Sequence, residues 1–154
     1  VRGAGVPAVH RTYLRTDGTG KAGLDGGDKL MLGATAGGAV RLTEGNGPLL
    51  IGEGLESTLS AFLLHADLTA SAWACLSTSG MRGLRLPKIG RLGRLGTSRP
   101  SLIIAVDGDV AGRAAGRDLA ERAVGLGWQV SIADPGDGAD WNDRLIEREQ
   151  SCEF

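Results

Sequence analysis

Residues 102–113 read LIIAVDGDVAGR, and this stretch decides the fold. Five apolar residues run directly into two carboxylates, Asp107 and Asp109, and an Ala-rich helical pattern follows at once. A continuous apolar run predicts a strand buried on both faces, as in a parallel sheet. The carboxyl end of such a strand is where open α/β sheets bind their ligands. Two acids there repel each other, so the stretch indicates either a divalent-cation site or an Asp-Gly turn in which Asp109 caps the next helix.

The composition excludes several classes of protein. The chain has 154 residues, enough for one domain with a proper core, and its formal net charge of −1 lacks the global basic character of a nucleic-acid binder. Cys75 and Cys152 lie far apart and no Cys-x-x-Cys motif occurs, which predicts no zinc site and suits a reducing cytoplasm. No apolar run approaches the roughly 18 residues of a membrane span, so we expect a cytoplasmic protein without a membrane segment. Because the chain opens on Val1, we expect it to be a piece of a longer one.

The pattern of apolar residues divides the chain after residue 47. Residues 1–47 are rich in glycine and turn signals, and we expect a small β-rich N-terminal lead-in with strands near 9–14 and 39–42. From residue 48 onward strands and helices alternate, which predicts an α/β domain over 48–150 with a central, mainly parallel four-stranded sheet flanked by helices. The expected strands are 49–52, 72–76, 102–106 and 128–133, and the expected helices are 55–64, a segment within 81–95, 110–125 and 140–149. The first helix is expected to bury one face made of Leu55, Leu59, Phe62 and Leu63.

Acidic residues follow two more of the expected strands. Glu53 comes directly after strand 49–52, so neighbouring strand ends would bring Glu53, Asp107 and Asp109 into one cluster. The alternative is that Glu53 only begins a helix, where an acid suits the helix dipole. After strand 128–133, a loop carries four acids, and the oxygen ligands of Asp140-x-Asn142 suit a hard cation such as Mg²⁺. The alternative for this loop is a solvated turn followed by a helix N-cap.

Taken together, the three acidic motifs resemble those of the Toprim domain. That domain is shared by bacterial-type DNA primases, type IA and type II topoisomerases, recombination-repair proteins and certain nucleases. The resemblance covers about residues 48–147. The Asp-Gly-Asp-x-Ala-Gly form and the Asp-x-Asn ending look most like the primases and primase-helicases of phages and mobile elements. The resemblance implies a Toprim-like α/β fold over residues 48–150 and a phosphoryl-transfer site that depends on Mg²⁺, with Mn²⁺ as a substitute.

The resemblance also implies roles for individual residues. Glu53, Asp107 and Asp109 would be catalytic and would hold the metal, with Asp140 and Asn142 completing the site. Clustered carboxylates hold Mg²⁺ ions that neutralise triphosphate charge and lower the pKa of an attacking 3′-hydroxyl. Asn142 stands where some relatives carry Asp, which removes one charge from a second metal site.

Basic residues gather between residues 81 and 101, with no acid among them. Further upstream, Lys29 lies in a segment that resembles the basic region ahead of the Toprim core in primases. The predicted nucleic-acid-binding residues are Arg82, Arg85, Lys88, Arg91, Arg94 and Lys29, through contacts with phosphates. The alternative is a solvated surface segment, because a spacing of three drifts around a helix and guarantees no single basic face.

Three classes of function fit these observations. The first is the catalytic domain of a DNA primase, a nucleotidyltransferase that polymerises ribonucleoside triphosphates on single-stranded DNA during DNA replication. The second is a metal-dependent Toprim nuclease, and the third is a non-catalytic module that binds nucleic acid. The resemblance favours the primase, with a helicase or zinc-binding domain elsewhere in the full-length chain. A topoisomerase needs a nucleophilic tyrosine, and the sole tyrosine, Tyr13, has no supporting context.

Overall fold

The N-terminal unit of the structure is a β-hairpin. The computed structural model describes residues 8–67, 69–89 and 99–151, and its backbone contacts divide the chain between Ala36 and Gly37. In the first unit, β1 (Ala8–Thr12) pairs antiparallel with β2 (Lys29–Gly33). This hairpin confirms that the lead-in is rich in β structure.

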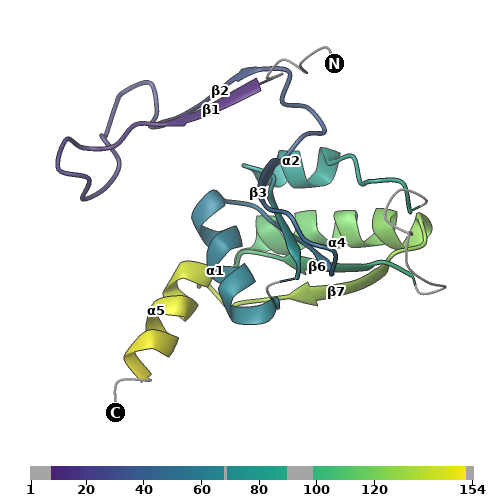
Figure 1. The fold of residues 1–154 in the computed structure, drawn as a ribbon. Coiled ribbons are helices and arrows are strands. Elements are labelled where there is room, and N and C mark those ends of the chain that lie inside the picture. Colours follow the sequence, from purple (N-terminus) through teal and green to yellow (C-terminus); the bar gives the residue numbers. More distant parts are fainter. Residues whose placement is uncertain (1–7, 68, 90–98, 152–154) are drawn as a thin grey trace. The chain divides into compact units, whose positions relative to one another are not determined.

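The second unit is built on a five-stranded, mainly parallel sheet, which confirms the predicted α/β class (Figure 1). The strand order is β3-β5-β4-β6-β7, with β3 antiparallel and the other neighbours parallel. The bounds are β3 Val40–Thr43, β4 Leu49–Gly52, β5 Ser71–Ala74, β6 Ser101–Ala105 and β7 Gln129–Ala133.

The predicted count of four strands is wrong, because β3 joins the main sheet. The strand predicted at 39–42 belongs to the main sheet and not to the lead-in, because β3 pairs with β5 at one edge of that sheet. An antiparallel edge strand on a parallel sheet is common. Here β3 forms hydrogen bonds with the backbone N–H and C=O groups of β5 that would otherwise face solvent. A division of the chain into 1–47 and 48–150 stays a prediction.

Helices cover both faces of this sheet (Figure 1). On one face α1 (Leu55–His65) packs with α5 (Trp141–Ser151), and on the other α2 (Thr78–Gly83) packs with α4 (Val110–Gly125). Helix α2 begins at Thr78, where the Ser77 side chain caps it by accepting from Gly80 N at 2.9 Å. The segment 81–95, predicted to hold a helix, overlaps the end of α2, and its residues 90–95 lie outside the described residues. Among the described helices, none is long and apolar enough to cross a membrane.

The two cores explain why β4 and β6 are continuous apolar runs. Ile51 and Ile104 point into the core beneath α2 and α4, whereas Leu50 points into the core beneath α1 and α5. The face predicted for α1 is confirmed at Phe62, which is buried, and wrong at Leu59 and Leu63, which are 41% and 54% exposed. The buried positions of α1 are Thr58, Ser60, Ala61 and Phe62.

Helix α4 lies close to β6 because Gly116 has no side chain. A Cβ atom at Gly116 would lie 2.2 Å from Cγ1 of Val106, the residue that follows β6. We expect Gly116→Ala to lower the free energy of unfolding by about 1–3 kcal/mol through overpacking. The matched control is Gly125→Ala in the same helix, where an added Cβ meets nothing within 4 Å. Chemical denaturation of both variants checks this, and equal midpoints would contradict the close packing.

Candidate functional site

The candidate site lies where β4 and β6 end side by side. Gly52 pairs with Ala105 in the parallel register, so Glu53 and Asp107 follow neighbouring strands at the same edge of the sheet. Neighbouring strands lie about 4.8 Å apart, which brings these two backbones close together. The structure therefore places Glu53 and Asp107 at one edge, as the sequence predicted.

The backbone of Glu53 is fixed by the loop that follows β5. Cys75 N donates to Gly52 O at 3.0 Å, and Leu76 N donates to Glu53 O at 2.7 Å. These bonds extend the β4–β5 pairing beyond the two strands. Leu76 adopts a left-handed backbone conformation with φ 69°, which is uncommon for a residue other than glycine. Backbone strain of this kind is often found at functional sites.

The charge of Glu53 also acts on Cys75. Burial, and to a lesser extent the negative charge of Glu53, together raise the pKa of the Cys75 thiol to about 12. The folded protein should therefore keep Cys75 as an unreactive thiol, because the thiolate is the nucleophile. We expect a Cys152→Ser variant to resist alkylation by iodoacetamide at pH 8 until it is unfolded. Rapid labelling of the folded variant would show that Cys75 is accessible and ionised.

The Asp107–Asp109 loop is bound to the loop that follows β7. Gly108 N donates to Ala139 O at 3.0 Å, and Gly108 O accepts from Gly138 N at 2.9 Å. A Cβ atom at Gly108 would lie 1.8 Å from Gly136 O, so no side chain fits there. The glycine between the two acids thus lets the ends of β6 and β7 close against each other.

Asp109 and Asp140 both cap helices. Asp109 accepts from Gly112 N at 2.6 Å at the start of α4, which confirms the capping interpretation of this residue. Asp140 accepts from the backbone N–H groups of Asn142 and Asp143 at 2.8 and 2.9 Å. In turn, the Asp143 carboxylate accepts a hydrogen bond from Asp140 N at 3.3 Å, so the two residues form a reciprocal cap at the start of α5.

The other loop acids pair with Arg113 on α4. Its guanidinium binds both carboxylate oxygens of Asp134, at 2.7 and 3.0 Å, and reaches Asp137 at 2.6 Å. The guanidinium holds the pKa of the Asp134 carboxyl below its usual value, and the two acids raise the pKa of Arg113. Arg113 therefore ties α4 to this loop instead of pairing with Asp109.

Trp141 is a positioning residue that the sequence analysis missed. Its Nε1 atom donates to Val106 O at 2.9 Å, and its ring makes an edge contact with His65 at 4.7 Å between centroids. The hydrogen bond holds the backbone immediately before Asp107. The signal in the sequence was a tryptophan directly after the Asp140 cap.

The predicted metal ligands are brought together only in part. Within residues 8–67, 69–89 and 99–151, no three His, Cys, Asp or Glu side chains lie close enough to hold a metal ion. Glu53, Asp107 and Asp109 share one edge of the sheet, whereas Asn142 Oδ1 accepts from Ser60 Oγ on α1 at 3.4 Å. The side-chain oxygens of Glu53, Asp107 and Asp109 are chemically suited to a hard divalent cation, because carboxylate oxygens are the ligands that Mg²⁺ prefers.

The predicted basic residues lie in several different settings. Arg82 pairs with Asp118 at 2.8 Å, whereas Arg85 and Lys88 line a pocket of about 780 Å³. Lys29 lies on exposed β2 in the first unit. Two further predicted contacts, Arg91 and Arg94, fall outside the described residues.

Comparisons with known proteins agree with this fold. A Toprim domain model matches residues 48–150, and a model of a domain of unknown function (DUF7146) matches residues 1–42. No curated protein matches the chain.

Two similar solved structures are primase domains. A DNA primase domain from Pseudomonas aeruginosa is similar with a TM-score of 0.54 and 18% identity, over 92% of this chain and 47% of that one. The RNA polymerase domain of Mycobacterium tuberculosis primase DnaG gives a TM-score of 0.46 and 24% identity, over 69% of this chain and 33% of that one. The chain thus spans less than half the length of either structure. The family model covers well over half of the sequence, and the chain belongs to the Toprim domain family.

Proposed function

We propose that this chain is the catalytic domain of a DNA primase, which synthesises RNA primers on single-stranded DNA by nucleotidyl transfer. The observation that carries the proposal is the placement of Glu53 and Asp107 at neighbouring strand ends of a Toprim domain. The likeness of the fold to a DNA primase domain supports the same choice among Toprim activities. Its substrates would be ribonucleoside triphosphates and a single-stranded DNA template.

The proposed metal ligands are Glu53, Asp107 and Asp109, with Asp140 beside them. A divalent cation, Mg²⁺ or Mn²⁺, would neutralise triphosphate charge and lower the pKa of the attacking 3′-hydroxyl. Asn142 would have to leave its contact with Ser60 to join this set.

The residues around the site would hold the acids in place before substrate arrives. Trp141 fixes the backbone at Val106, the Asp109 cap fixes the start of α4, and the bonds of Gly108 fix the loop between them. Such support matters because a catalytic constellation must be held within about 0.5 Å of its productive geometry. The chain's own contribution is therefore to position charge.

The proposal extends to the setting in which the protein works. A primase acts in DNA replication, and we place this one in the cytoplasm. A helicase or a zinc-binding domain in the full-length chain would supply template opening or template recognition.

Primer synthesis tests the proposal directly. The protein in its full natural length is incubated with ribonucleoside triphosphates, Mg²⁺ and a labelled single-stranded DNA template. Template-dependent RNA products support the primase. Cleavage of the template without RNA synthesis would identify a Toprim nuclease instead, and binding without either reaction would identify a non-catalytic module.

A further inference from the structure

A basic pocket lies at the β3 edge of the second unit, apart from the acidic residues of the candidate site. Its volume is about 780 Å³, within the range of pockets that hold small ligands. The side chains that give it chemical character are Arg41, Trp73, Arg85, Lys88, Leu86 and Pro87. No acid is among the described residues that line it.

The pairing of β3 with β5 builds the centre of this pocket. Arg41 and Trp73 are partners in the register, so their side chains lie on the same face of the sheet. The Arg41 guanidinium carbon lies 4.9 Å from the centroid of the Trp73 ring. Helix α4 packs on β6 and β7 and therefore does not cover β3 and β5. The segment after α2 lines the pocket beside those two strands instead.

That segment adds the other two cations. Arg85 N donates to Gly37 O at 3.1 Å, and the Arg85 side chain lies against Gly37. Among the described residues, Arg41, Arg85 and Lys88 take part in no ion pair, unlike Arg82, Arg113 and Arg144. Three cations around an indole, with no neutralising acid, favour an anionic ligand that also carries a flat ring.

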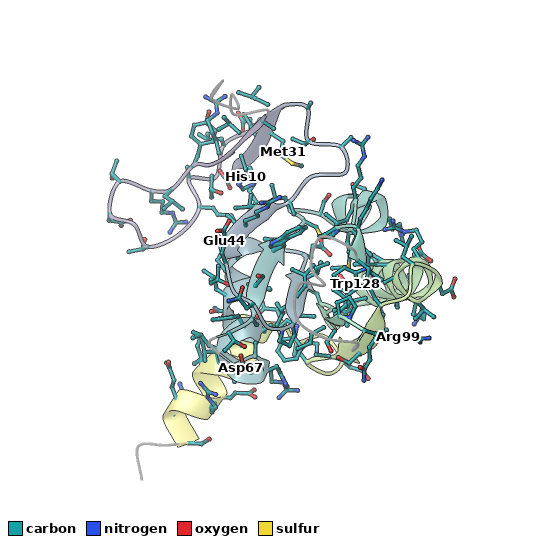
Figure 2. All side chains as sticks on the ribbon, turned by 45° about the vertical axis from the view of Figure 1, so that its right-hand side comes forward. His10, Met31, Glu44, Asp67, Arg99 and Trp128 are labelled. Carbon is teal, nitrogen blue, oxygen red and sulfur yellow. The ribbon has the colours of Figure 1, made fainter. Side chains whose placement is uncertain are left out.

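A second, smaller pocket of about 330 Å³ shares Arg41 and Trp73 with the basic pocket. It is also lined by Glu44 and Asn46, which follow β3. Glu44, labelled in Figure 2, gives this end a negative charge, so phosphates would lie on the Arg85 side. Two pockets that share one aromatic residue suit a strand longer than a single nucleotide.

We propose that these two pockets form one groove that binds single-stranded DNA. In this groove a base stacks on the surface formed by Trp73 and the Arg41 guanidinium. Arg85 and Lys88 contact the flanking phosphates. Bases stack on aromatic side chains and on guanidinium planes, and a basic groove tracks the backbone. The inference rests on the proposed function, because a primase requires a template strand, and it names where that strand lies.

Tryptophan fluorescence reports on the stacking of a base against Trp73. Trp128, labelled in Figure 2, and Trp141 are only 3% and 2% exposed, whereas Trp73 is partly exposed at the groove. Addition of an oligo(dT) about 8 nucleotides long, without divalent metal, should therefore quench the emission of Trp73. Trp73→Leu should abolish the quench and weaken binding by roughly 5- to 100-fold, and Trp73→Phe should restore part of the affinity.

Charge variants test the phosphate contacts. Arg85→Ala and Lys88→Ala should each flatten the plot of log affinity against log salt concentration by about 0.7. The matched control is Arg117→Ala, an exposed arginine on α4 that does not line the groove and should leave the slope unchanged. Circular dichroism melts of all variants show whether each one is folded.

The outcomes separate this inference from the proposed function. Binding that is weakened by the groove variants and unchanged in Arg117→Ala supports the groove, whether or not RNA is made. Oligo(dT) binding that is unchanged in folded Trp73→Leu and Arg85→Ala overturns the groove, even where primer synthesis continues. Binding of thymidine monophosphate as tight as that of oligo(dT) would also overturn it, because the ligand would then be a free nucleotide.

Discussion

Asp107→Asn should reduce primer synthesis by about 100-fold or more while leaving the melting temperature nearly unchanged. The amide keeps the shape of the carboxylate at the end of β6 but removes the charge that would hold a divalent cation. A bound metal supplies several kcal/mol of transition-state stabilisation, and each 1.4 kcal/mol or so is a factor of ten in rate. Template-directed RNA synthesis by the full-length protein measures the effect.

The matched control for this variant is Asp118→Asn. Asp118 lies on α4 and pairs with Arg82 across an exposed surface, so its loss should cost little stability and no activity. Wild-type turnover by Asp107→Asn would remove this residue from the mechanism.

Gly108→Ala should damage both stability and activity. The added Cβ would meet two carbonyl oxygens of the loop after β7, Gly136 O at 1.8 Å and Ala139 O at 2.7 Å. Because both contacts are backbone atoms, the loops after β6 and β7 must separate, at a cost of about 3 kcal/mol. The separation also moves Asp107 and Asp109, so we expect primer synthesis to fall further than stability alone explains.

The control here is Gly83→Ala at the end of α2, where an added Cβ has open space. Thermal melts and primer assays on both variants make the comparison. A Gly108→Ala protein with the wild-type melting temperature and rate would show that the two loops are not closed against each other.

The sequence was sufficient for the parts of the fold that depend on continuous patterns. The apolar runs in β4 and β6 predicted strands buried on both faces, and α4 follows directly from the Ala-rich pattern after Asp109. The place of β3 could not be predicted in this way. Its pairing joins Val40 to Ala74, and no local pattern reports a contact between residues so far apart in the chain.

The exposed leucines of α1 show a second limit of pattern reading. Leu59 and Leu63 share a face by periodicity, yet Ala61 and Phe62 are the side chains that pack on the sheet with Thr58. Small residues let the helix approach the sheet closely, and hydrophobicity alone does not identify them. Propensity and periodicity therefore located this helix and the burial of Phe62, but not the small residues that complete its buried side.

Strand ends predicted the candidate site, whereas side-chain partners did not follow from the sequence. Glu53 and Asp107 were predicted because parallel strands end at the same edge. The salt bridges of Arg113 and the hydrogen bond of Trp141 depend on how the loop after β7 folds back. The Arg41–Trp73 pair was missed because only the β3–β5 register brings the two residues together.

Glu53 and Asp107 should form a divalent-cation site, and thermal melts with Mn²⁺ are the most direct test of that site. A ligand that binds only the folded state stabilises it by about 2.7 kcal/mol at 100 times its dissociation constant. We predict that millimolar Mn²⁺ raises the melting temperature of the wild-type chain and that Asp107→Asn and Glu53→Gln lose this shift. Identical wild-type melting curves with and without Mn²⁺, together with no heat in a calorimetric titration, would show that Glu53 and Asp107 hold no divalent cation.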